Sequence, residues 1–496
     1  MHTAPYPPIA LPDRSVEIDV GTLPGVPEET GAVGWLLCDS ETAPEALGVT
    51  AERLTELAFT AKRGTSLQLA GPKGPIQVLL GAGERAALNA AGVRDAAAVL
   101  AREVPQAATL ALVLPDGVDT EAAAAAAVEG VVLARYAYRI GKAPDAPALK
   151  RLTLLTTHEG RQAAEAGVAR GRILVRTAEL ARDLAGTPGG MLTATRLGDI
   201  AVEVGQAAGL EVELFGEKEL LELGCGGLLG INLGSVEPPV MVKLVYRPAG
   251  EPSGRLTLVG KGITYDSGGL ALKPGDEVHA TMKNDMTGAG AILAAMTALR
   301  DLGCAAQVTG YLMCTDNMPS GSALRLGDIV VMRGGTTVEV INTDAEGRMV
   351  MADALVLARE EPVDAIVDIA TLTGAALATF GPEIAAMLGT SDDLLDQVRA
   401  SADRVDELVW ELPLVTNYRD QLDSVTADLR NLGGPTAGTI TAALFLKEFI
   451  GDVPWAHLDI AGPAQASAAR GWRNRGTTGF GARLLLDLAL NFRIPA

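Results

Sequence analysis

The sequence predicts an α/β protein with two domains, the second of which contains a mixed, mostly parallel sheet flanked by helices. Two observations support this fold class. Short apolar runs of strand length alternate with longer helical patterns along the chain, which is typical of sheets with helical crossovers. The 496 residues exceed one ordinary domain, and an apolar content of 48% is enough for a large core. We therefore expect a smaller N-terminal α/β domain over residues 1–165 and a C-terminal domain over residues 166–496.

The charge balance is strongly acidic, with 41 Lys and Arg residues against 61 Asp and Glu residues and a formal net charge of −20. Such a protein repels nucleic acids and anionic membranes, so neither is an expected partner. The four cysteines lie far apart and form no CxxC motif, which fits a reducing cytosol. The N-terminus lacks the features of a signal peptide, and no apolar stretch is long enough to span a bilayer. We expect a cytoplasmic protein.

The N-terminal domain shows a mixed pattern of short elements. Residues 1–30 are rich in proline and acidic residues, and we expect a loose arm there. The predicted strands cover residues 33–38, 76–80, 109–114 and 151–155. The predicted helices cover residues 51–59, 93–102 and 121–138. This part contains no cluster of catalytic groups, so we expect it to act in packing, assembly or regulation.

The C-terminal domain begins with a long helical pattern over residues 163–186, and we expect residues 166–184 to link the two domains. Strands and helices then alternate, which favours a sheet with parallel strands. The predicted strands cover residues 240–246, 255–259, 307–314 and 365–370. The predicted helices cover residues 193–208, 289–301, 349–359 and 396–409.

The stretch from Val338 to Arg348 reads VEVINTDAEGR and carries the first chemical signal. Its alternating apolar residues indicate the end of a strand, and a helical pattern begins at Met349. In an extended segment, side chains at positions i and i+2 point to the same side, so Asp344 and Glu346 would face one point. Arg348 would follow at the next position on that side. A turn from a strand into a helix is also where open α/β sheets bind their ligands.

Further charged residues follow other predicted strands or precede helices, and together they suggest a metal site. The whole set comprises Lys261, Asp266, Lys273, Asp285, Asp344, Glu346 and Arg348. If its four carboxylates converge, they cannot all ionise without compensation, and two divalent cations would balance them. Carboxylate oxygens suit Mg²⁺ or Mn²⁺, and Zn²⁺ is a further option. A pair of metals can activate water, and the remaining Lys273 and Arg348 would stabilise charge on the reacting group.

Each of these signals also has a plainer interpretation. An isolated DxE pair is usually a solvated turn, with roughly one chance in five of binding a metal. Lys261 could be a surface lysine, and Asp285 could be the N-cap of the helix that follows it. The segment YDSGG at Tyr265–Gly269 matches the surroundings of the nucleophile in chymotrypsin-like proteases. That chemistry needs a histidine base and an all-β double barrel, so we regard the match as chance.

The motifs together resemble the leucyl aminopeptidases, also called cytosol aminopeptidases (peptidase family M17). NTDAEGR is similar to the signature octapeptide of that family, NTDAEGRL, with Met349 in place of the last leucine. Other motifs follow in the order of the family: VGKGITYDSGGLALK, MKNDM, NMPSG, ATLTGA and WAHLDIAG. The resemblance covers the chain from about Leu180 to its C-terminus. The part before it is similar only in kind, as a variable N-terminal domain.

The resemblance implies a metal-dependent aminopeptidase with two divalent ions per subunit, Mn²⁺ or Zn²⁺, with Mg²⁺ also possible. By motif position, one metal would be bound by Lys261, Asp266, Asp285 and Glu346. The other would be bound by Asp266, Asp344 and Glu346, so that Asp266 and Glu346 bridge the pair. Lys261 would have to be neutral as a ligand, with its pKa well below ~10.4 because of desolvation and the charge of the metal.

The resemblance also implies roles around the metals. Lys273 would polarise the scissile carbonyl group and stabilise the tetrahedral intermediate. Arg348 would hold a bicarbonate ion that acts as general base on the bridging water. The substrate contacts would be Met282, Asn342, Ala345, Thr371, Leu372, Gly374, Ala461 and Ala464. Apolar groups at these positions suit a Leu-like first residue whose free α-amine binds a metal, so the expected substrates are short peptides.

Two positions depart from the family pattern. The spacing from Lys273 to Asp285 is one residue longer than we expect for the family, and the loop between them is more polar. Ala464 replaces a larger residue that some members place in the specificity pocket, which would widen that pocket.

The family is typically a hexamer formed by two trimers, so the resemblance implies a homohexamer. Two other functions are compatible with the same fold. One is an architectural or regulatory DNA-binding hexamer, which would need a basic stripe that the N-terminal domain does not show. The other is a catalytically silent scaffold, which is disfavoured because every charged position of the motif set is filled.

Overall fold

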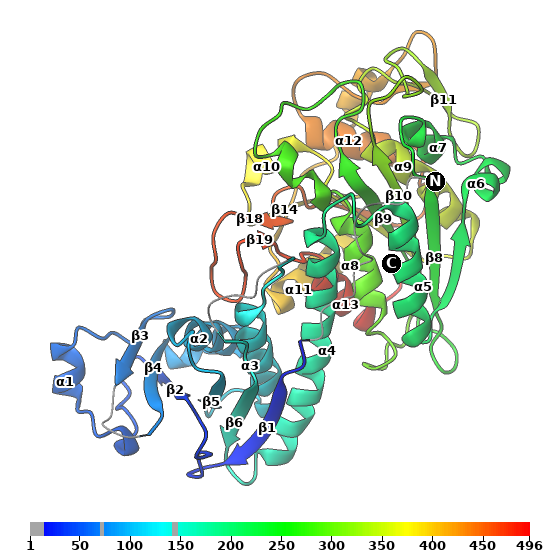
Figure 1. Cartoon of the computed structure of the whole chain (residues 1–496). Coiled ribbons are helices and arrows are strands. Elements are labelled where there is room, and N and C mark those ends of the chain that lie inside the picture. Colours follow the sequence, from blue (N-terminus) through cyan, green and yellow to red (C-terminus); the bar gives the residue numbers. More distant parts are fainter. Residues whose placement is uncertain (1–13, 70–73, 141–146) are drawn as a thin grey trace. The chain divides into compact units, whose positions relative to one another are not determined.

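The computed structural model describes residues 14–69, 74–140 and 147–496 (Figure 1). Contacts between residues divide the chain into two compact units. The N-terminal unit comprises residues 14–179 together with Ser467–Arg475, and the C-terminal unit comprises Leu180–Ala466 with Gly476–Ala496. The predicted boundary after residue 165 lies inside helix α4 (Arg161–Gly186), which crosses the division.

The N-terminal unit is built on a six-stranded sheet in the order β1-β6-β5-β2-β4-β3. All neighbouring strands are parallel except β3 and β4. The strands are β1 (Glu17–Thr22), β2 (Ala32–Cys38), β3 (Ser66–Leu69), β4 (Ile76–Gly83), β5 (Thr109–Val113) and β6 (Arg151–Thr156). The helices are α1 (Ala51–Glu56), α2 (Ala90–Glu103), α3 (Thr120–Arg135) and the first part of α4. Each strand and helix predicted between residues 33 and 155 is therefore present.

The prediction of a loose arm over residues 1–30 is wrong for Glu17–Thr22, which form strand β1. Strand β1 pairs in parallel with β6, from Glu17 beside Arg151 to Thr22 beside Thr156. The segment reads EIDVGT, and its acidic residues concealed the strand. Because β1 lies at the edge of the sheet, it has one neighbouring strand and needs few apolar side chains. Residues 1–13 lie outside the described residues.

The two faces of this sheet pack against different elements. Val78 and Leu80 of β4 join the core formed with α2, α3 and the start of α4. Leu79 lies between them in sequence and packs with Leu54 of α1. Because successive strand residues point to opposite faces, α2 and α3 cover one face and the connection that contains α1 covers the other (Figure 1). Trp472, from the distant segment Ser467–Arg475, joins the core on the α2 and α3 side.

The C-terminal unit contains an eight-stranded sheet in the order β15-β14-β17-β13-β9-β10-β8-β7. Its centre is parallel, because β17, β13, β9 and β10 run in one direction. The strands are β7 (Glu211–Phe215), β8 (Val240–Tyr246), β9 (Arg255–Asp266), β10 (Gln307–Asn317), β13 (Ala365–Ala370), β14 (Ala385–Gly389), β15 (Val409–Glu411) and β17 (Trp455–Asp459). The predicted fold class, two α/β domains with a mixed and mostly parallel C-terminal sheet, is confirmed.

Helices cover both faces of this sheet and two small sheets lie beside it. The helices are α5 (Ala194–Ala207), α6 (Glu217–Leu223), α7 (Gly226–Asn232), α8 (Thr287–Met296), α9 (Gly347–Glu360), α10 (Gly374–Phe380), α11 (Asp392–Val405), α12 (Gly438–Lys447) and α13 (Ala482–Leu490). The small sheets are β11 (Ile329–Val331), β12 (Thr337–Glu339) and β16 (Leu429–Arg430), and β18 (Gln465–Ala466) with β19 (Gly476–Thr477). Val259 of β9 packs in the core with α7, α9 and α12, whereas a Cβ at Gly260 would meet Ala289 and Ile292 of α8.

Several predicted ends in this unit need correction. The helix predicted to reach residue 301 ends at Met296, and the strand predicted to end at residue 314 continues to Asn317. Strand β9 continues to Asp266 instead of ending at residue 259, because its pairing with β10 extends until Asp266 lies beside Asn317. Lys261 and Asp266 are therefore part of the strand. The helix predicted to reach residue 409 ends at Val405, where Asp406 adopts a left-handed conformation with φ 57° that closes the helix. Strand β15 begins a few residues later.

The described helices include none that is long and apolar enough to cross a membrane. All four cysteines are free and buried.

Candidate metal centre

Strand β9 brings the first two charged groups of the site into the interior. Lys261 is 2% exposed and its Nζ atom lies 2.8 Å from Asp285 Oδ2 and 2.6 Å from Glu346 Oε1. The same ammonium group donates a hydrogen bond to the carbonyl oxygen of Thr371 at 2.9 Å. A glycine is needed opposite, because a Cβ at Gly347 would lie 2.7 Å from the Cε atom of Lys261. The sheet core and the start of α9 thus fix the position of this ammonium group.

Asp285 lies at the end of a short 3₁₀ helix, His279–Asn284, directly before α8. It is not the N-cap of α8, because Met286 holds that position. Its carboxylate accepts a hydrogen bond from Thr371 Oγ1 at 2.6 Å in addition to its contact with Lys261. The longer loop before it therefore still delivers Asp285 to the other charged groups.

The turn that contains Asp344 and Glu346 delivers two further carboxylates. Oxygen atoms of Asp266, Asp344 and Glu346 lie within 4.8 Å of one another. The convergence of Asp344 and Glu346 was predicted from an extended segment, but the backbone there is not extended. Glu346 has φ −74° and ψ −37° and is the N-cap of α9, so a turn followed by the first helical residue brings the carboxylates together. The expected strand ends earlier, at Glu339.

Lys273 lies across this carboxylate group, on the loop after β9. Its Nζ atom lies 2.7 Å from Asp266 Oδ2 and 2.5 Å from Asp344 Oδ1. The loop can turn here because Gly268 and Gly269 have φ values of 90° and 64°. A Cβ at Gly268 would lie 2.5 Å from the carbonyl oxygen of Ala271, so a larger residue would displace the loop.

Burial and repulsion between carboxylates shift the pKa values of these groups. Burial, followed by the charge of Asp266, raises the pKa of Glu346 to about 7. Burial also raises the pKa of Asp285 and of Asp344. For Lys261, burial favours a lower pKa, but the charges of Asp285 and Glu346 outweigh it and raise the pKa. The two lysines thus supply part of the positive charge that the carboxylates require.

The residues present fit a pair of divalent cations. The buried Oε2 atom of Glu346 has no hydrogen-bond partner among the described residues, so one ligand atom is available in the interior of the site. The carboxylates of Asp266, Asp285, Asp344 and Glu346 provide the oxygen-rich donor set that hard divalent cations prefer. With protein groups alone, the ammonium of Lys261 lies between two of these carboxylates. A neutral Lys261, as the ligand assignment requires, would need the charge of a bound metal beside it.

Arg348 is the second residue of α9, and it is 4% exposed. Burial lowers the pKa of its guanidinium group to about 10. Its Nε and Nη1 atoms are buried and make no hydrogen bond to the described residues. These unpaired donors suit a small anion.

Asn317 and Thr343 hold the carboxylates in place, and neither was among the predicted site residues. Asn317 donates from Nδ2 to Asp266 Oδ1 at 2.8 Å and to the carbonyl oxygen of Thr343 at 3.0 Å. The hydroxyl group of Thr343 donates to the carbonyl oxygen of Gly268 at 2.7 Å. Asn317 belongs to the NMPSG motif, so the motif contained a signal for it.

Asn431 fixes the turn before α9 and was also missed. Its side chain is completely buried and accepts from the amide of Ile341 at 2.9 Å while donating to the carbonyl oxygen of Asn342 at 2.6 Å. It lies directly after β16, far from the turn in sequence. No pattern around Asn431 marks it, because most of its partners are backbone atoms.

The predicted substrate contacts fall on four segments of the C-terminal unit. Asn342 and Ala345 lie on the turn before α9, and Met282 lies in the 3₁₀ helix before Asp285. Thr371, Leu372 and Gly374 connect β13 to α10, and Ala461 and Ala464 follow β17. Met282, Asn342, Leu372 and Ala461 are half-buried and Gly374 is exposed. Ala464 is completely buried.

Asp459 organises two of these loops and was not predicted as a site residue. Its Oδ1 atom accepts hydrogen bonds from the amides of Leu372 at 3.1 Å, Thr373 at 3.3 Å and Ala461 at 3.2 Å. Its Oδ2 atom accepts from the hydroxyl group of Thr373 at 2.6 Å. The carboxylate is completely buried, so it ties the loop after β13 to the loop after β17. The motif WAHLDIAG contained it, but a buried acid at a strand end has several possible roles.

Comparisons with known proteins agree on one family. The model of the catalytic domain of the cytosol aminopeptidase family matches residues 179–486, and the model of its N-terminal domain matches residues 40–144. A probable cytosol aminopeptidase of Synechococcus sp. (strain JA-3-3Ab) is 41% identical over 457 residues, which is 89% of this chain and 89% of that protein. A probable cytosol aminopeptidase of Chlorobaculum tepidum is 44% identical over 380 residues, which is 74% of this chain and 75% of that protein.

A solved structure is similar over nearly the whole chain. The bottromycin maturation enzyme BotP in complex with Mn has a TM-score of 0.84 and 38% sequence identity, and the match covers 93% of this chain and 99% of that chain.

Proposed function

The chain belongs to the cytosol aminopeptidase family and is an aminopeptidase by that membership, and we propose further that it uses two divalent metal ions and prefers a Leu-like first residue. Its substrates would be short peptides, and its role would be intracellular peptide turnover. One observation carries the metal proposal. The carboxylate oxygens of Asp266, Asp344 and Glu346 lie within 4.8 Å of one another, and Asp285 contacts the same lysine as Glu346.

The proposed ligand set is the one that the family resemblance implies. Lys261, Asp266, Asp285 and Glu346 would hold one metal, and Asp266, Asp344 and Glu346 would hold the other. A pair of divalent cations bound there would balance the carboxylates, lower the pKa of water and bind the free α-amine of the peptide. Mn²⁺ is supported by the manganese in the similar structure, while Zn²⁺ and Mg²⁺ have compatible ligand preferences.

Two basic residues would act on the reacting groups. Lys273 is only partly buried, with a side chain 17% exposed, so its ammonium group can turn to the scissile carbonyl oxygen and stabilise the negative charge that develops there. Arg348 would hold a bicarbonate ion through its unpaired Nε and Nη1 atoms. A bicarbonate held there would act as the general base.

The substrate pocket would be formed by the loops that Asp459 ties together. Thr371, Leu372 and Gly374 would contact the peptide on one side, and Ala461 would line the side-chain pocket, with the completely buried Ala464 beneath its wall. Met282, Asn342 and Ala345 would complete it. The partly buried apolar residues among them favour an apolar first side chain over a charged one.

The assembly and location are proposed from the family. We propose a homohexamer in the cytoplasm, and four free cysteines are compatible with a reducing compartment. A DNA-binding role is disfavoured by the net charge of −20. We expect no shift of duplex DNA in a gel at low salt.

Hydrolysis of leucine p-nitroanilide at mildly alkaline pH, with metal analysis of the purified protein, tests the proposed function. We expect two divalent ions per chain and activity that depends on Mn²⁺ or Zn²⁺. Asp344→Ala, Glu346→Ala and Lys273→Ala should each lower kcat/KM by on the order of 10²-fold or more. Glu360→Ala is the control, because Glu360 is the exposed last residue of the helix that Glu346 precedes. Full activity in the three site variants would show that the site is assigned wrongly.

A further inference from the structure

The carboxyl ends of β2 and β5 in the N-terminal unit open into a cavity of about 530 Å³ that the proposed reaction does not use. Apolar residues at the two strand ends line part of it, among them Leu36, Leu37, Val113 and Leu114. Its rim is polar and includes Glu41, Arg85 and Asp116, among other residues. Sites for small molecules have volumes of roughly 300–1,000 Å³ and combine apolar walls with a few polar groups. The cavity has both properties.

The topology of the sheet independently marks the same place. Strands β2 and β5 are parallel neighbours. After β2 the chain continues to β3 and β4 on one side of the sheet order, whereas after β5 it continues to β6 on the other side. The two outgoing connections also cover opposite faces, with α1 on one and α3 on the other. Open α/β sheets bind ligands in the crevice outside such a pair of strand ends.

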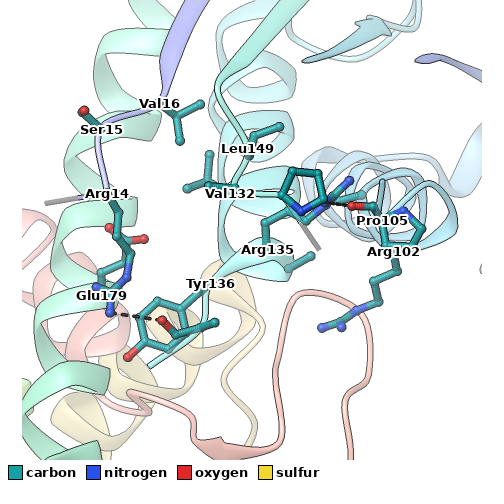
Figure 2. A pocket seen from close by; sticks show the side chains of 15 residues that line it. Arg14, Ser15, Val16, Arg102, Pro105, Val132, Arg135, Tyr136, Leu149 and Glu179 are labelled. Atoms are coloured by element: carbon teal, nitrogen blue, oxygen red, sulfur yellow. Dashed lines mark hydrogen bonds between the residues drawn. The ribbon is translucent and has the colours of Figure 1, made fainter. Parts of the chain in front are cut away.

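A second cavity in this unit, of about 540 Å³, lacks this support (Figure 2). Arg102 and Arg135 line it, but their guanidinium groups bind backbone carbonyls. Arg135 donates to the carbonyl oxygens of Val104 and Pro105 at 2.6 Å each, at the C-terminal end of α2. Cations stabilise helix C-termini, so Arg135 has a structural role. Arg102 also has one, because it donates to the carbonyl oxygens of Gly471 and Arg473.

The charged residues that line the cavity at the ends of β2 and β5 differ in how many of their hydrogen-bonding groups already have partners. Glu41 is engaged on both oxygens, because Oε1 accepts from Arg85 Nε at 2.7 Å and Oε2 accepts from the amide of Cys38 at 2.9 Å. Arg85 also donates from Nη2 to Glu41 and from Nη1 to the carbonyl oxygen of Asp116 at 2.7 Å. Two of its five N–H groups therefore remain without a partner among the described residues. The carboxylate of Asp116 is exposed and accepts no hydrogen bond from the described residues.

We propose that this cavity binds an apolar α-amino acid as its zwitterion. The carboxylate would bind the remaining N–H groups of Arg85, the ammonium group would bind Asp116, and the side chain would pack against the apolar residues of the lining. Arg85 is the only basic residue among the described lining residues, and two acidic residues lie beside it, so a phosphate-bearing ligand is disfavoured. The biological reason for such a site rests on the proposed function, since an aminopeptidase with that preference releases free apolar amino acids.

Equilibrium dialysis of the full metal-loaded chain with radiolabelled L-leucine tests the proposal by counting bound leucine per chain. Asp116→Asn and Arg85→Gln should each remove one leucine from the count or weaken that site at least about tenfold, because each deletes one charge-assisted contact. Arg53→Gln removes a surface ion pair on α1 in the same unit and should leave the count unchanged. Asp116→Asn tests the site without risk to the fold, because this carboxylate makes no contact that folding requires.

The outcomes separate this proposal from the proposed function. If the peptidase assignment is correct, the wild-type chain should also bind leucine at the metal centre, and the variants should retain that site. If the peptidase assignment fails, the wild type should still bind one leucine and the variants none. The proposal is overturned if both variants bind as much leucine as the wild type. It is also overturned if isoamylamine or 4-methylpentanoate, which lack one of the two charges, compete for this site as well as leucine does.

Discussion

Asn317 illustrates how a neutral side chain sets the geometry of a charged one. It is 3% exposed, and both of its donated hydrogen bonds go to the metal centre, one to Asp266 and one to the backbone of Thr343. Asp266 is the carboxylate that contacts Lys273 and that the proposed ligand sets share. Groups that orient metal ligands commonly affect metal affinity nearly as much as the ligands do.

Replacing Asn317 by alanine should weaken metal binding by roughly 10–100-fold, because Asp266 would lose the donor that fixes its orientation. The measurement is a calorimetric titration of the metal-free protein with Mn²⁺. Asn232→Ala is a matched control, since Asn232 also donates two hydrogen bonds, to Glu237 and Thr315, but contacts no carboxylate of the site. Equal Mn²⁺ affinity in the two variants would show that Asn317 does not orient a metal ligand.

Helix α9 connects the candidate metal centre to the rest of the C-terminal unit. Its first residues include Arg348, and its middle carries Asp353, which is completely buried. Asp353 accepts hydrogen bonds from the amide of Leu228 at 3.0 Å, in α7, and from the amide of Arg333 at 2.9 Å, after β11. One carboxylate thus joins three elements. Burial raises its pKa to about 7 in spite of these hydrogen bonds.

This raised pKa predicts that the contribution of Asp353 to stability depends on pH. Between its ordinary pKa near 3.8 and about 7, the folded state holds a proton that the unfolded state lacks. The contribution is therefore fully present at low pH and falls as pH rises through this window, by up to about 1.4 kcal/mol per pH unit. Above about pH 7 both states are ionised and the dependence should end.

Urea unfolding of the wild type and of Asp353→Asn at several pH values measures this effect. The stability of the wild type relative to the variant should fall from pH 5 to pH 7 and then level off. Asp452→Asn, at an exposed carboxylate of the same unit, should show no such fall. A difference between wild type and Asp353→Asn that rises with pH would contradict the assignment.

The N-terminal unit is not one continuous stretch of the chain. Ser467–Arg475 belongs to it, and Trp472 of this segment is 3% exposed in its core. Arg102 donates to the carbonyl oxygens of Gly471 at 2.7 Å and Arg473 at 2.8 Å, so the segment is held by its backbone as well. Arg94 stacks under the indole ring, with its Cζ atom 5.4 Å from the ring centre. The folding of this unit therefore requires a piece of chain from near the C-terminus.

Replacing Trp472 by alanine should destabilise the N-terminal unit by about 3–5 kcal/mol, as is typical of a buried tryptophan. Hydrogen exchange measured by mass spectrometry should show faster exchange in α2 and α3, which share its core. Trp410→Ala is the control, because Trp410 is 62% exposed and lies in the other unit. If hydrogen exchange in α2 and α3 is the same in Trp472→Ala as in the wild type, Ser467–Arg475 only covers the N-terminal unit and does not stabilise its core.

Local patterns were sufficient for most elements and for the family. Strands such as β8 and β13 agree with their predicted residues because a run of apolar side chains is a property of the stretch itself. The motif NTDAEGR and its companions indicated the cytosol aminopeptidase family for the same reason, and the family models confirm it. The acidic edge strand β1 was missed, since an edge strand has little apolar pattern to detect.

Contacts between distant residues could not be read in this way. Asn431 holds the turn before α9, Asp459 joins two loops, and Trp472 completes the core of a unit far from it in sequence. The convergence of Asp344 and Glu346 was predicted, but from an extended backbone in place of the turn that the structure has. In each case the partner is chosen by how the strands and helices pack. Packing depends on the order of the strands in the sheets and on burial, and a linear sequence carries neither explicitly.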